Sequence, residues 1–194
     1  MNLKVLGIST SPRVDGSSDL LLRQALAGAE STGASTEYIS LRDFNIAPCV
    51  ECNDCYTTGK CRVEDDFQLI LQKMLDADRL IFATPIFFMT VCAQAKALID
   101  RGQCLWANKH ILKKPLFTTD RDRRAMAIAV GGSKSTKMFE GIRLTMKYWL
   151  DVLEFNYTAE LFINQIGEPA RIKQHPTALN DAYRLGRELT TATK

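Results

Sequence analysis

Four of the six cysteines lie close together in the sequence, at Cys49, Cys52, Cys55 and Cys61. They form the pattern C-x2-C-x2-C-x5-C, whose two-residue gaps let thiolates converge on one centre, and the first three repeat the spacing of bacterial ferredoxin clusters. We therefore expect the four residues to ligate one [4Fe–4S] cluster. Zinc, disulfides and free thiols are the alternatives, although structural zinc more often uses two separated C-x2-C pairs. The other two, Cys92 and Cys104, are expected to be small buried hydrophobes.

A second segment whose residues could bind a ligand is the hydroxyl-rich stretch from Ser9 to Ser18, between an expected strand and an expected helix. Backbone N–H groups at a helix N-terminus, with the helix dipole behind them, form a ready anion site. The side chains expected to hold a phosphate there are Ser9, Ser11, Arg13, Ser17 and Ser18. Neither G-x-G-x-x-G nor G-x-x-x-x-G-K-[ST] occurs, so a monoester phosphate fits better than a dinucleotide. The alternative is an ordinary turn and N-cap.

Two further loops could line the same site. One contains Thr84, Pro85, Ile86, Phe87, Phe88 and Met89, and the other contains Gly131 and Gly132. The aromatic pair and the methionine predict a flat apolar wall, with backbone N–H groups for the polar edge of a flavin ring. The glycines would allow a planar ligand to approach closely. Alternatively, the aromatic residues only cover the edge of the sheet. The glycines could equally form an ordinary turn.

The rest of the sequence predicts how these segments are positioned. Buried strands are expected at Leu3–Ile8, Ser35–Ser40, Arg79–Ala83, Ala125–Val130 and Tyr157–Ile163. Helices are expected at Ser18–Gly33, around 67–75, 91–99 and 138–153, and at Thr177–Thr191. This alternation predicts an α/β fold, a three-layer doubly wound five-stranded parallel sheet. Ligands of such folds bind outside the carboxyl ends of the strands. We expect one domain over residues 1–194, with the cysteines on a loop at about 45–65.

Composition narrows the function classes. The chain has 194 residues, 46% of them hydrophobic, and a formal net charge of +3, with no strongly basic face that would suggest nucleic acid. No apolar stretch approaches the roughly 20 residues that span a bilayer. The N-terminus lacks the regions of a signal peptide, so we expect a cytoplasmic protein and no membrane association. Six cysteines in a reducing compartment favour metal or redox chemistry.

Taken together, these segments resemble the iron–sulfur flavoproteins, a branch of the NAD(P)H-dependent FMN reductase group with the flavodoxin-like fold. Gly7 to Ser18 resembles the group's phosphate loop, with Ser17 and Ser18 in place of the usual Asn-Thr. The stretch from Thr84 to Arg101 resembles its isoalloxazine loop and following helix. It ends in the recurrent K-x-x-x-D-R pattern, formed here by Lys96, Asp100 and Arg101. Phe87 stands where tyrosine is common, and Met89 replaces a small residue.

The resemblance implies FMN and a [4Fe–4S] cluster as cofactors of an FMN-dependent oxidoreductase. Electrons would pass from a reduced ferredoxin, through cluster and flavin, to a small oxidant such as oxygen or peroxide. It also implies a homodimer or homotetramer in which a neighbour covers part of the flavin. An NAD(P)H-dependent FMN or quinone reductase without a cluster and a flavodoxin-type electron carrier are the alternatives. We assign no catalytic acid or base, because neither His110 nor His175 falls in a candidate loop.

The segment Ala107–Arg124 carries six basic residues, namely Lys109, Lys113, Lys114, Arg121, Arg123 and Arg124. One interpretation is a solvated loop. The other is a docking surface for an acidic ferredoxin or for an NADPH phosphate.

Overall fold

The computed structural model describes residues 2–168 and 171–191, and its centre is a parallel sheet. The strands run in the order β2-β1-β3-β5-β6. Their bounds are β1 (Lys4–Ser9), β2 (Ser35–Ser40), β3 (Arg79–Phe87), β5 (Arg124–Val130) and β6 (Asn156–Ile163). A short β4 (Thr90–Val91) pairs antiparallel with the end of β3. The order reverses beside β1 and β3, so the predicted doubly wound parallel sheet is confirmed.

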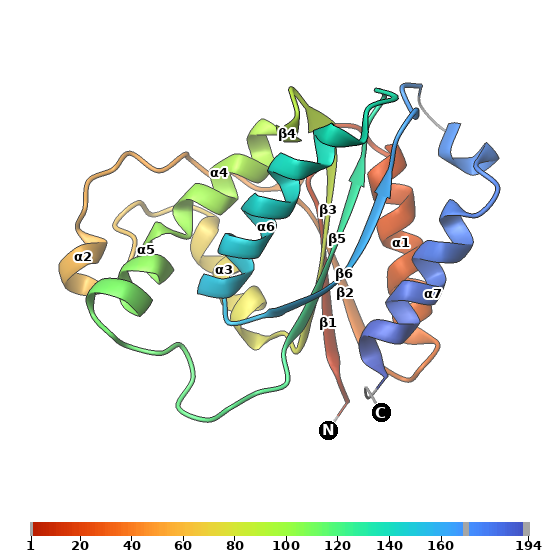
Figure 1. Ribbon diagram of the computed structural model, residues 1–194. Coiled ribbons are helices and arrows are strands. Elements are labelled where there is room, and N and C mark those ends of the chain that lie inside the picture. Colours follow the sequence, from red (N-terminus) through yellow and green to blue (C-terminus); the bar gives the residue numbers. More distant parts are fainter. Residues whose placement is uncertain (1, 169–170, 192–194) are drawn as a thin grey trace.

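Helices cover both faces of this sheet (Figure 1). One face carries α1 (Ser17–Glu30) and α7 (Ala178–Thr190). The other carries α3 (Phe67–Asp76), α4 (Ala93–Arg101), α5 (Gln103–Trp106) and α6 (Glu140–Val152). Short helical turns occur at α2 (Cys55–Thr58), η1 (Leu41–Asp43), η2 (Ala107–Ile111), η3 (Thr136–Phe139) and η4 (Arg171–Gln174). None of the helices in the described part of the chain is long and apolar enough to cross a membrane.

The sheet has a hydrophobic core on each face, as expected for parallel strands flanked by helices. On the α1 and α7 side, Leu21, Leu22 and Ala182 pack against Ile81 and Met126. The opposite core contains buried residues of β1, β3, β5, α3, α4 and α6. Successive strand residues point to opposite faces, which is why β5 reads as an uninterrupted apolar run after its first residue. Because a hydrophobic core packs on each face, the sheet is rigid. The loops at the carboxyl ends of its strands therefore start from fixed positions.

The segment predicted as a loop after the third strand is in fact mostly strand. The expected strand ended at Ala83, but β3 continues to Phe87, and Pro85 sits opposite Val130 of β5. Phe88 and Met89 then have φ angles of 48° and 68°, so they form a two-residue hairpin turn that leads into β4. The strand is longer than expected because its end forms ladder hydrogen bonds with neighbouring strands. The run of apolar residues in the sequence does not show this pairing.

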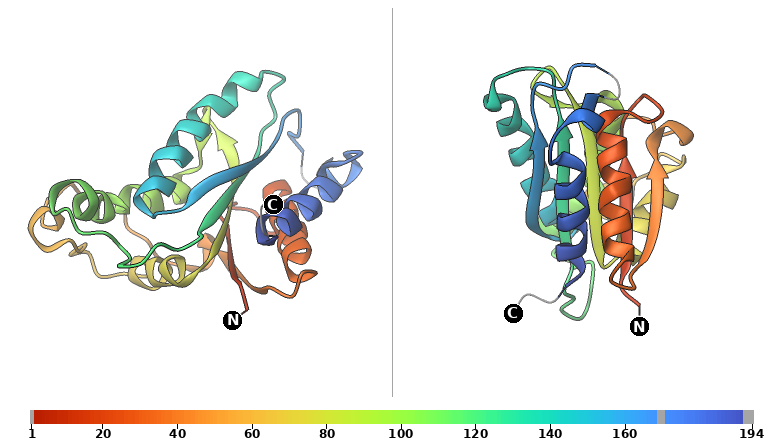
Figure 2. Two further views of the ribbon diagram at one scale, coloured as in Figure 1. Left: turned by 60° about the horizontal axis from the view of Figure 1, so that its bottom comes forward. Right: turned by 90° about the vertical axis from the view of Figure 1, so that its right-hand side faces the viewer.

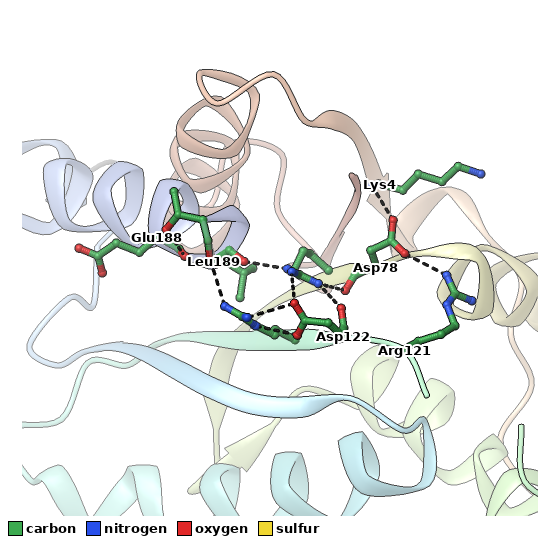
Figure 3. A network of polar contacts seen from close by, with 9 residues as sticks. Lys4, Asp78, Arg121, Asp122, Glu188 and Leu189 are labelled. Atoms are coloured by element: carbon green, nitrogen blue, oxygen red, sulfur yellow. Dashed lines mark hydrogen bonds and ion pairs between the residues drawn. The ribbon is translucent and has the colours of Figure 1, made fainter. Parts of the chain in front are cut away.

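Charged side chains hold the amino edge of the sheet together, on the side away from the strand carboxyl ends. Figure 3 shows Asp78, just before β3, and Asp122, just before β5, at the centre of this network. Arg79 donates to Asp122 Oδ2 at 2.8 Å and to the carbonyl of Leu189 in α7 at 2.8 Å. Arg124 also donates to Asp122, at 2.8 Å. The network joins β3, β5 and α7 at the edge opposite the candidate site.

Candidate functional site

A pocket of about 320 Å³ opens at the carboxyl ends of β1, β3 and β5. Its wall on one side is the segment from Ser11 to Ser18, which joins β1 to α1. The end of β3, the end of β5 and residues 166–168 after β6 complete the lining. We call this cavity the carboxyl-end pocket, and we call residues 9–18 the phosphate loop. The carboxyl-end pocket lies at the position where doubly wound sheets bind ligands.

The phosphate loop is shaped by its own side chains. Ser11 Oγ donates to the Arg13 carbonyl at 3.1 Å and accepts from the Arg13 N–H at 3.2 Å. Asp15 has a φ of 52°, which turns the chain back toward α1. A Cβ at Gly16 would lie 2.5 Å from Ser11 Oγ, so only glycine allows this approach. The loop is therefore a defined turn.

The first turn of α1 offers free hydrogen-bond donors to the pocket. Gly16 is the N-cap residue, no side chain caps the helix, and Gly16, Ser17 and Ser18 all line the cavity. The first N–H groups of a helix have no intrahelical acceptor, and the dipole makes this end positive. Two exposed carboxylates, Asp15 and Glu168, share the rim with Arg13. The floor of the pocket can therefore bind an anionic group through backbone N–H groups.

A buried acidic residue in this first turn is neutralised from behind. Asp19 is fully buried and accepts hydrogen bonds from Tyr38 Oη at 2.5 Å and from Arg23 Nε at 3.4 Å. Burial raises the pKa of Tyr38, and its hydrogen bond to Asp19 raises it further. Tyr38 therefore stays a neutral donor to Asp19.

Arg42, which the sequence analysis did not single out, fixes the phosphate loop from outside. It lies in η1, directly after β2, and its Nη1 donates to the carbonyls of Ser11 at 3.1 Å and Arg13 at 2.8 Å. These bonds hold the two carbonyls away from the pocket and add a positive charge behind the loop. Its separation of about thirty residues from the loop leaves no local pattern in the sequence.

The structure brings most of the predicted ligand-binding residues to the carboxyl-end pocket. Those that line it are Ser11, Arg13, Ser17, Ser18, Pro85, Ile86, Phe87, Gly131 and Gly132. Ser9 is completely buried, and Thr84 is buried with its hydroxyl donating to the Pro85 carbonyl at 2.9 Å. Phe88 and Met89 lie at the hairpin turn, where the Phe88 ring is fully exposed. The predicted residues that do not line the carboxyl-end pocket are therefore Ser9, Thr84, Phe88 and Met89.

Three lining residues carry no recognisable motif, namely Ile166, Gly167 and Glu168. They follow β6, and the sequence analysis assigned no role to the loop after the fifth strand. The Gly167 Cα lies 3.3 Å from where a Gly132 Cβ would be. Only the pairing of β6 with β5 brings this segment beside Gly132.

The four clustered cysteines lie on a long loop on the α3 and α4 side, residues 47–63, which we call the cysteine loop. Cys55 is buried, Cys49 and Cys61 are partly buried, and Cys52 is exposed. Positive φ angles at Glu51 (53°) and Asn53 (61°) turn the backbone between the first three cysteines. Burial raises the pKa of the Cys55 thiol, and the neighbouring Cys52, Cys49 and Cys61 raise it further.

No metal-binding arrangement is already assembled there. Within residues 2–168 and 171–191, no three side chains of His, Cys, Asp or Glu are grouped closely enough to hold a metal ion. The four cysteines also differ in their access to solvent, from buried Cys55 to exposed Cys52.

The remaining two cysteines are buried. Cys104 has 3% of its surface exposed, and burial raises the pKa of its thiol to about 11, with a further contribution from nearby Cys61 and Cys55. Cys92 Sγ lies 3.0 Å from the Thr10 carbonyl, beneath the phosphate loop. Both are packed as the small hydrophobes that the sequence predicts.

The cysteine loop and the carboxyl-end pocket are separate regions. Figure 1 and Figure 2 place α2 at one end of the molecule, away from the start of α1. A groove of about 640 Å³ lies beside Cys49, between the cysteine loop, α4, α5 and α6. It is lined in part by Tyr56, Trp106, Tyr148 and Trp149, and it shares no lining residue with the carboxyl-end pocket. A loop after the second strand of a parallel sheet is expected to open at the same edge as the loops after the first and third strands. The chain after β2 instead runs outward across the α4 side (Figure 1).

Most of the positive charge between Ala107 and Arg124 is engaged within the chain. Lys109 pairs with Asp151 at 2.7 Å, Arg121 with Asp78 at 2.9 Å, and Arg124 with Asp122 at 2.8 Å. Arg123 is buried and donates to the carbonyls of Met74, Ala77 and Leu153. Burial lowers the pKa of Arg123 to about 10. These contacts favour a structural role over the docking interpretation.

The sequence matches a known family over the segment that forms this architecture. Residues 3–154 match the family described as NADPH-dependent FMN reductase. The chain belongs to this family. An iron–sulfur flavoprotein of Methanocaldococcus jannaschii is 34% identical over 99% of this chain and 98% of its own length. Another, from Methanosarcina thermophila, is 32% identical over 69% of this chain and 65% of its own length. This FMN-reductase-family chain is thus a relative of the iron–sulfur flavoproteins and an FMN-dependent oxidoreductase.

Solved structures confirm the flavodoxin-like fold of this family member. The NAD(P)H:quinone oxidoreductase from Methanothermobacter marburgensis superimposes with a TM-score of 0.75, covering all of this chain and 99% of the other. Sequence identity between the two is 18%, so the comparison concerns the fold alone.

Proposed function

We propose that this FMN-dependent oxidoreductase passes electrons between a [4Fe–4S] cluster on the cysteine loop and FMN in the carboxyl-end pocket. A reduced ferredoxin would be the donor, and a small oxidant such as oxygen or peroxide the acceptor. When bound, the cluster supplies one-electron steps, and FMN supplies steps of one or two electrons. The observation that carries the proposal is the set of four free cysteines between positions 49 and 61, on one loop of a member of the FMN reductase family.

The cysteine loop fits a cluster in its chemistry. Soft thiolates are the ligands that iron–sulfur clusters use, and Cys49, Cys52, Cys55 and Cys61 supply four. The Cys55 thiol is held protonated by burial and by its neighbours, and a bound cation would reverse that effect. Arg101 Nε already donates to Cys61 Sγ at 3.2 Å. The loop thus provides both the sulfur ligands and a positive charge beside them.

The carboxyl-end pocket fits the phosphate and ring of FMN. The uncapped N–H groups of the first turn of α1, with Arg13, would hold the phosphate. Ile86 and Phe87 from β3 and Gly131 and Gly132 after β5 would lie along the isoalloxazine ring. Ser11 would act by shaping the loop, because its hydroxyl is already bonded to Arg13. We assign no residue of this pocket as an acid or base. His175 accepts the N–H groups of Thr177 and Ala178 near the start of α7.

Assembly into a homodimer or homotetramer is part of this proposal. The cysteine loop and the carboxyl-end pocket share no lining residues within one chain. A neighbouring copy that brings its cysteine loop to this pocket would shorten the electron path. The fully exposed Phe88 and the half-exposed Met89, at the hairpin beside the pocket, would be covered in such an assembly. Light scattering at micromolar concentration tests this, and a monomeric mass would contradict it.

The family match favours one alternative function. The matching family is described by its use of NADPH, so a reductase without a cluster would also use the carboxyl-end pocket. In that case the thiols would hold zinc or remain free. A flavodoxin-type carrier would bind FMN but show no steady-state turnover.

Anaerobic purification separates these functions. We expect FMN, iron and acid-labile sulfide in amounts corresponding to one FMN and one [4Fe–4S] cluster per chain, and reduction of the flavin by reduced ferredoxin. A chain that holds FMN but no iron after reconstitution, and turns over with NADPH, would establish the plain reductase. Failure with every acceptor would favour the carrier. The expected compartment is the cytoplasm, where thiols are kept reduced.

A further inference from the structure

Arg101, at the end of α4, is a buried arginine whose contacts all lie at the cysteine loop or its base. The residue has 1% of its surface exposed, and its guanidinium lies over the ring of Phe67 at 4.5 Å. A buried guanidinium is unfavourable unless its N–H groups find acceptors. The acceptors that it uses therefore show which segment it stabilises.

The guanidinium bridges the two ends of the cysteine loop. Nη1 donates to the carbonyl of Ala47 at 3.0 Å, two residues before Cys49. Nη2 donates to the carbonyl of Val63 at 2.8 Å, two residues after Cys61. Through these bonds one side chain, anchored in a helix of the main fold, joins the entrance of the loop to its exit.

Asp65 completes this closure. It accepts from Arg101 Nη1 at 2.7 Å and from the Ala47 N–H at 2.8 Å, and its side chain is 7% exposed. Burial alone would raise the pKa of Asp65, but the hydrogen bonds from Arg101, Ala47 and Phe67 lower it. The carboxylate is therefore charged, and the pair with Arg101 is a satisfied buried ion pair. Removing either partner would leave the other uncompensated.

The fourth contact reaches a sulfur atom. Arg101 Nε donates to Cys61 Sγ at 3.2 Å, which is within hydrogen-bond distance for sulfur. Hydrogen bonds to cluster sulfurs are one of the terms that set a reduction potential. A charged donor stabilises the more negative, reduced state, so this contact would raise the potential.

We propose that Arg101 is the positioning residue of the cysteine loop: it closes the loop at Ala47 and Val63 and orients Cys61 through its sulfur. The closure consists of hydrogen bonds within this chain, whereas the effect on potential rests on the proposed function. The loop's short α2 and left-handed residues give it little rigidity of its own.

Arg79 provides a matched control. It is also buried, with 3% of its surface exposed, and it also donates to backbone carbonyls and to one carboxylate, Asp122. It lies in the network of Figure 3, at the opposite sheet edge. An effect of losing any buried arginine would appear equally in Arg79 variants.

The experiment compares Arg101→Gln and Arg101→Lys with Arg79→Gln and Arg79→Lys, all made and reconstituted without oxygen. We would measure three properties: iron affinity, the midpoint potential, and hydrogen exchange of residues 47–63 without the cluster. We expect Arg101→Gln to weaken iron retention about 10- to 100-fold. It should also lower the potential of any cluster retained and speed exchange of the Ala47 amide. Lysine should restore part of the potential but not the exchange, because its compact ammonium lacks the planar fork with which the guanidinium reaches several acceptors at once. Both Arg79 variants should keep all three properties while lowering the unfolding midpoint.

Three results would separate the outcomes. Unchanged exchange and iron retention in Arg101→Gln would overturn the proposal, as would equal losses in Arg79→Gln. If the wild-type chain takes up no iron, the proposed function fails. Exchange in the cysteine loop then still decides whether Arg101 closes it.

Discussion

The phosphate loop and the cysteine loop differ in what holds them. The phosphate loop runs directly from β1 into the 14-residue helix α1, and its N–H donors belong to that helix. The cysteine loop contains only α2, of four residues, and is fixed at its two ends by Arg101 and Asp65. Side chains support both loops, but the phosphate loop leads into a long helix, whereas the cysteine loop has almost no regular structure of its own.

This difference teaches that the two sites can be disrupted independently. Regular elements distribute their stability over many hydrogen bonds and two hydrophobic cores. A loop with little regular structure opens locally at a lower free-energy cost. Substitutions in one loop should therefore leave the other ligand bound, and the following predictions test that independence.

The largest effect is expected for the cysteines themselves. Serine at Cys49, Cys52, Cys55 or Cys61 replaces a soft thiolate with a hard oxygen ligand, so the cluster should be lost while FMN stays bound. Iron, sulfide and FMN contents of anaerobically prepared single variants measure this. Cys92→Ser and Cys104→Ser serve as controls that should keep the cluster, because both thiols are buried away from solvent. Retention by Cys61→Ser together with loss in Cys104→Ser would show that the ligand assignment is wrong.

A reciprocal pair of glycine substitutions sharpens the comparison. Gly59 has a φ of 73°, and a Cβ there would lie 2.3 Å from Asn108 Oδ1, so Gly59→Ala should distort the loop just before Cys61. Gly16→Ala should instead push Ser11 Oγ out of its turn. We expect Gly59→Ala to weaken iron retention and Gly16→Ala to weaken FMN binding, each about tenfold, since one displaced buried hydrogen bond is worth about 1–2 kcal/mol. Titration of both ligands in both variants is the measurement. Loss of both ligands in either variant would contradict independence.

A smaller effect is expected when the charge behind the phosphate loop is removed. Arg42→Gln should weaken FMN binding about three- to tenfold, since it releases the carbonyls of Ser11 and Arg13. Arg13→Ala, an exposed charge at the rim, should weaken FMN binding without unfolding the protein. Riboflavin, which lacks the phosphate, should bind all three proteins alike. Equal loss of riboflavin affinity would place the effect outside the phosphate contact.

The smallest effect is expected at the amino edge of the sheet. Hydrogen bonds from Arg124 and the charge of Arg79 lower the pKa of Asp122 below its ordinary 3.8. A lowered folded-state pKa stabilises the fold above pH 3.8, and this contribution is lost as the pH falls through the folded-state value. Because the side chain is 56% exposed, Asp122→Asn should cost less than about 1 kcal/mol at neutral pH. Denaturant unfolding at pH 7 and pH 3 should show the difference shrinking, with FMN and iron binding unchanged. A difference that persists undiminished at pH 3 would contradict this.

Much of the fold follows from patterns visible in the sequence. Ser35–Ser40 is a strand with the predicted bounds, and the other four parallel strands differ by a few residues, because buried apolar runs mark them directly. The antiparallel β4 and the turn at Phe88 and Met89 were missed. Both depend on β3 continuing beside β5 as far as Pro85, which pairs with Val130, 45 positions later in the chain.

The sequence alone determined which residues carry chemistry: cysteine spacing and a hydroxyl-rich segment between a strand and a helix are local features. The tertiary structure decided what supports those residues. Arg42 reaches Ser11 and Arg13, and Arg101 reaches Ala47, Val63 and Cys61, across separations of 29 to 54 positions. It also decided that the cysteine loop lies apart from the carboxyl-end pocket. Long-range contacts depend on how packed elements place distant segments, and neither residue type nor spacing encodes that placement locally.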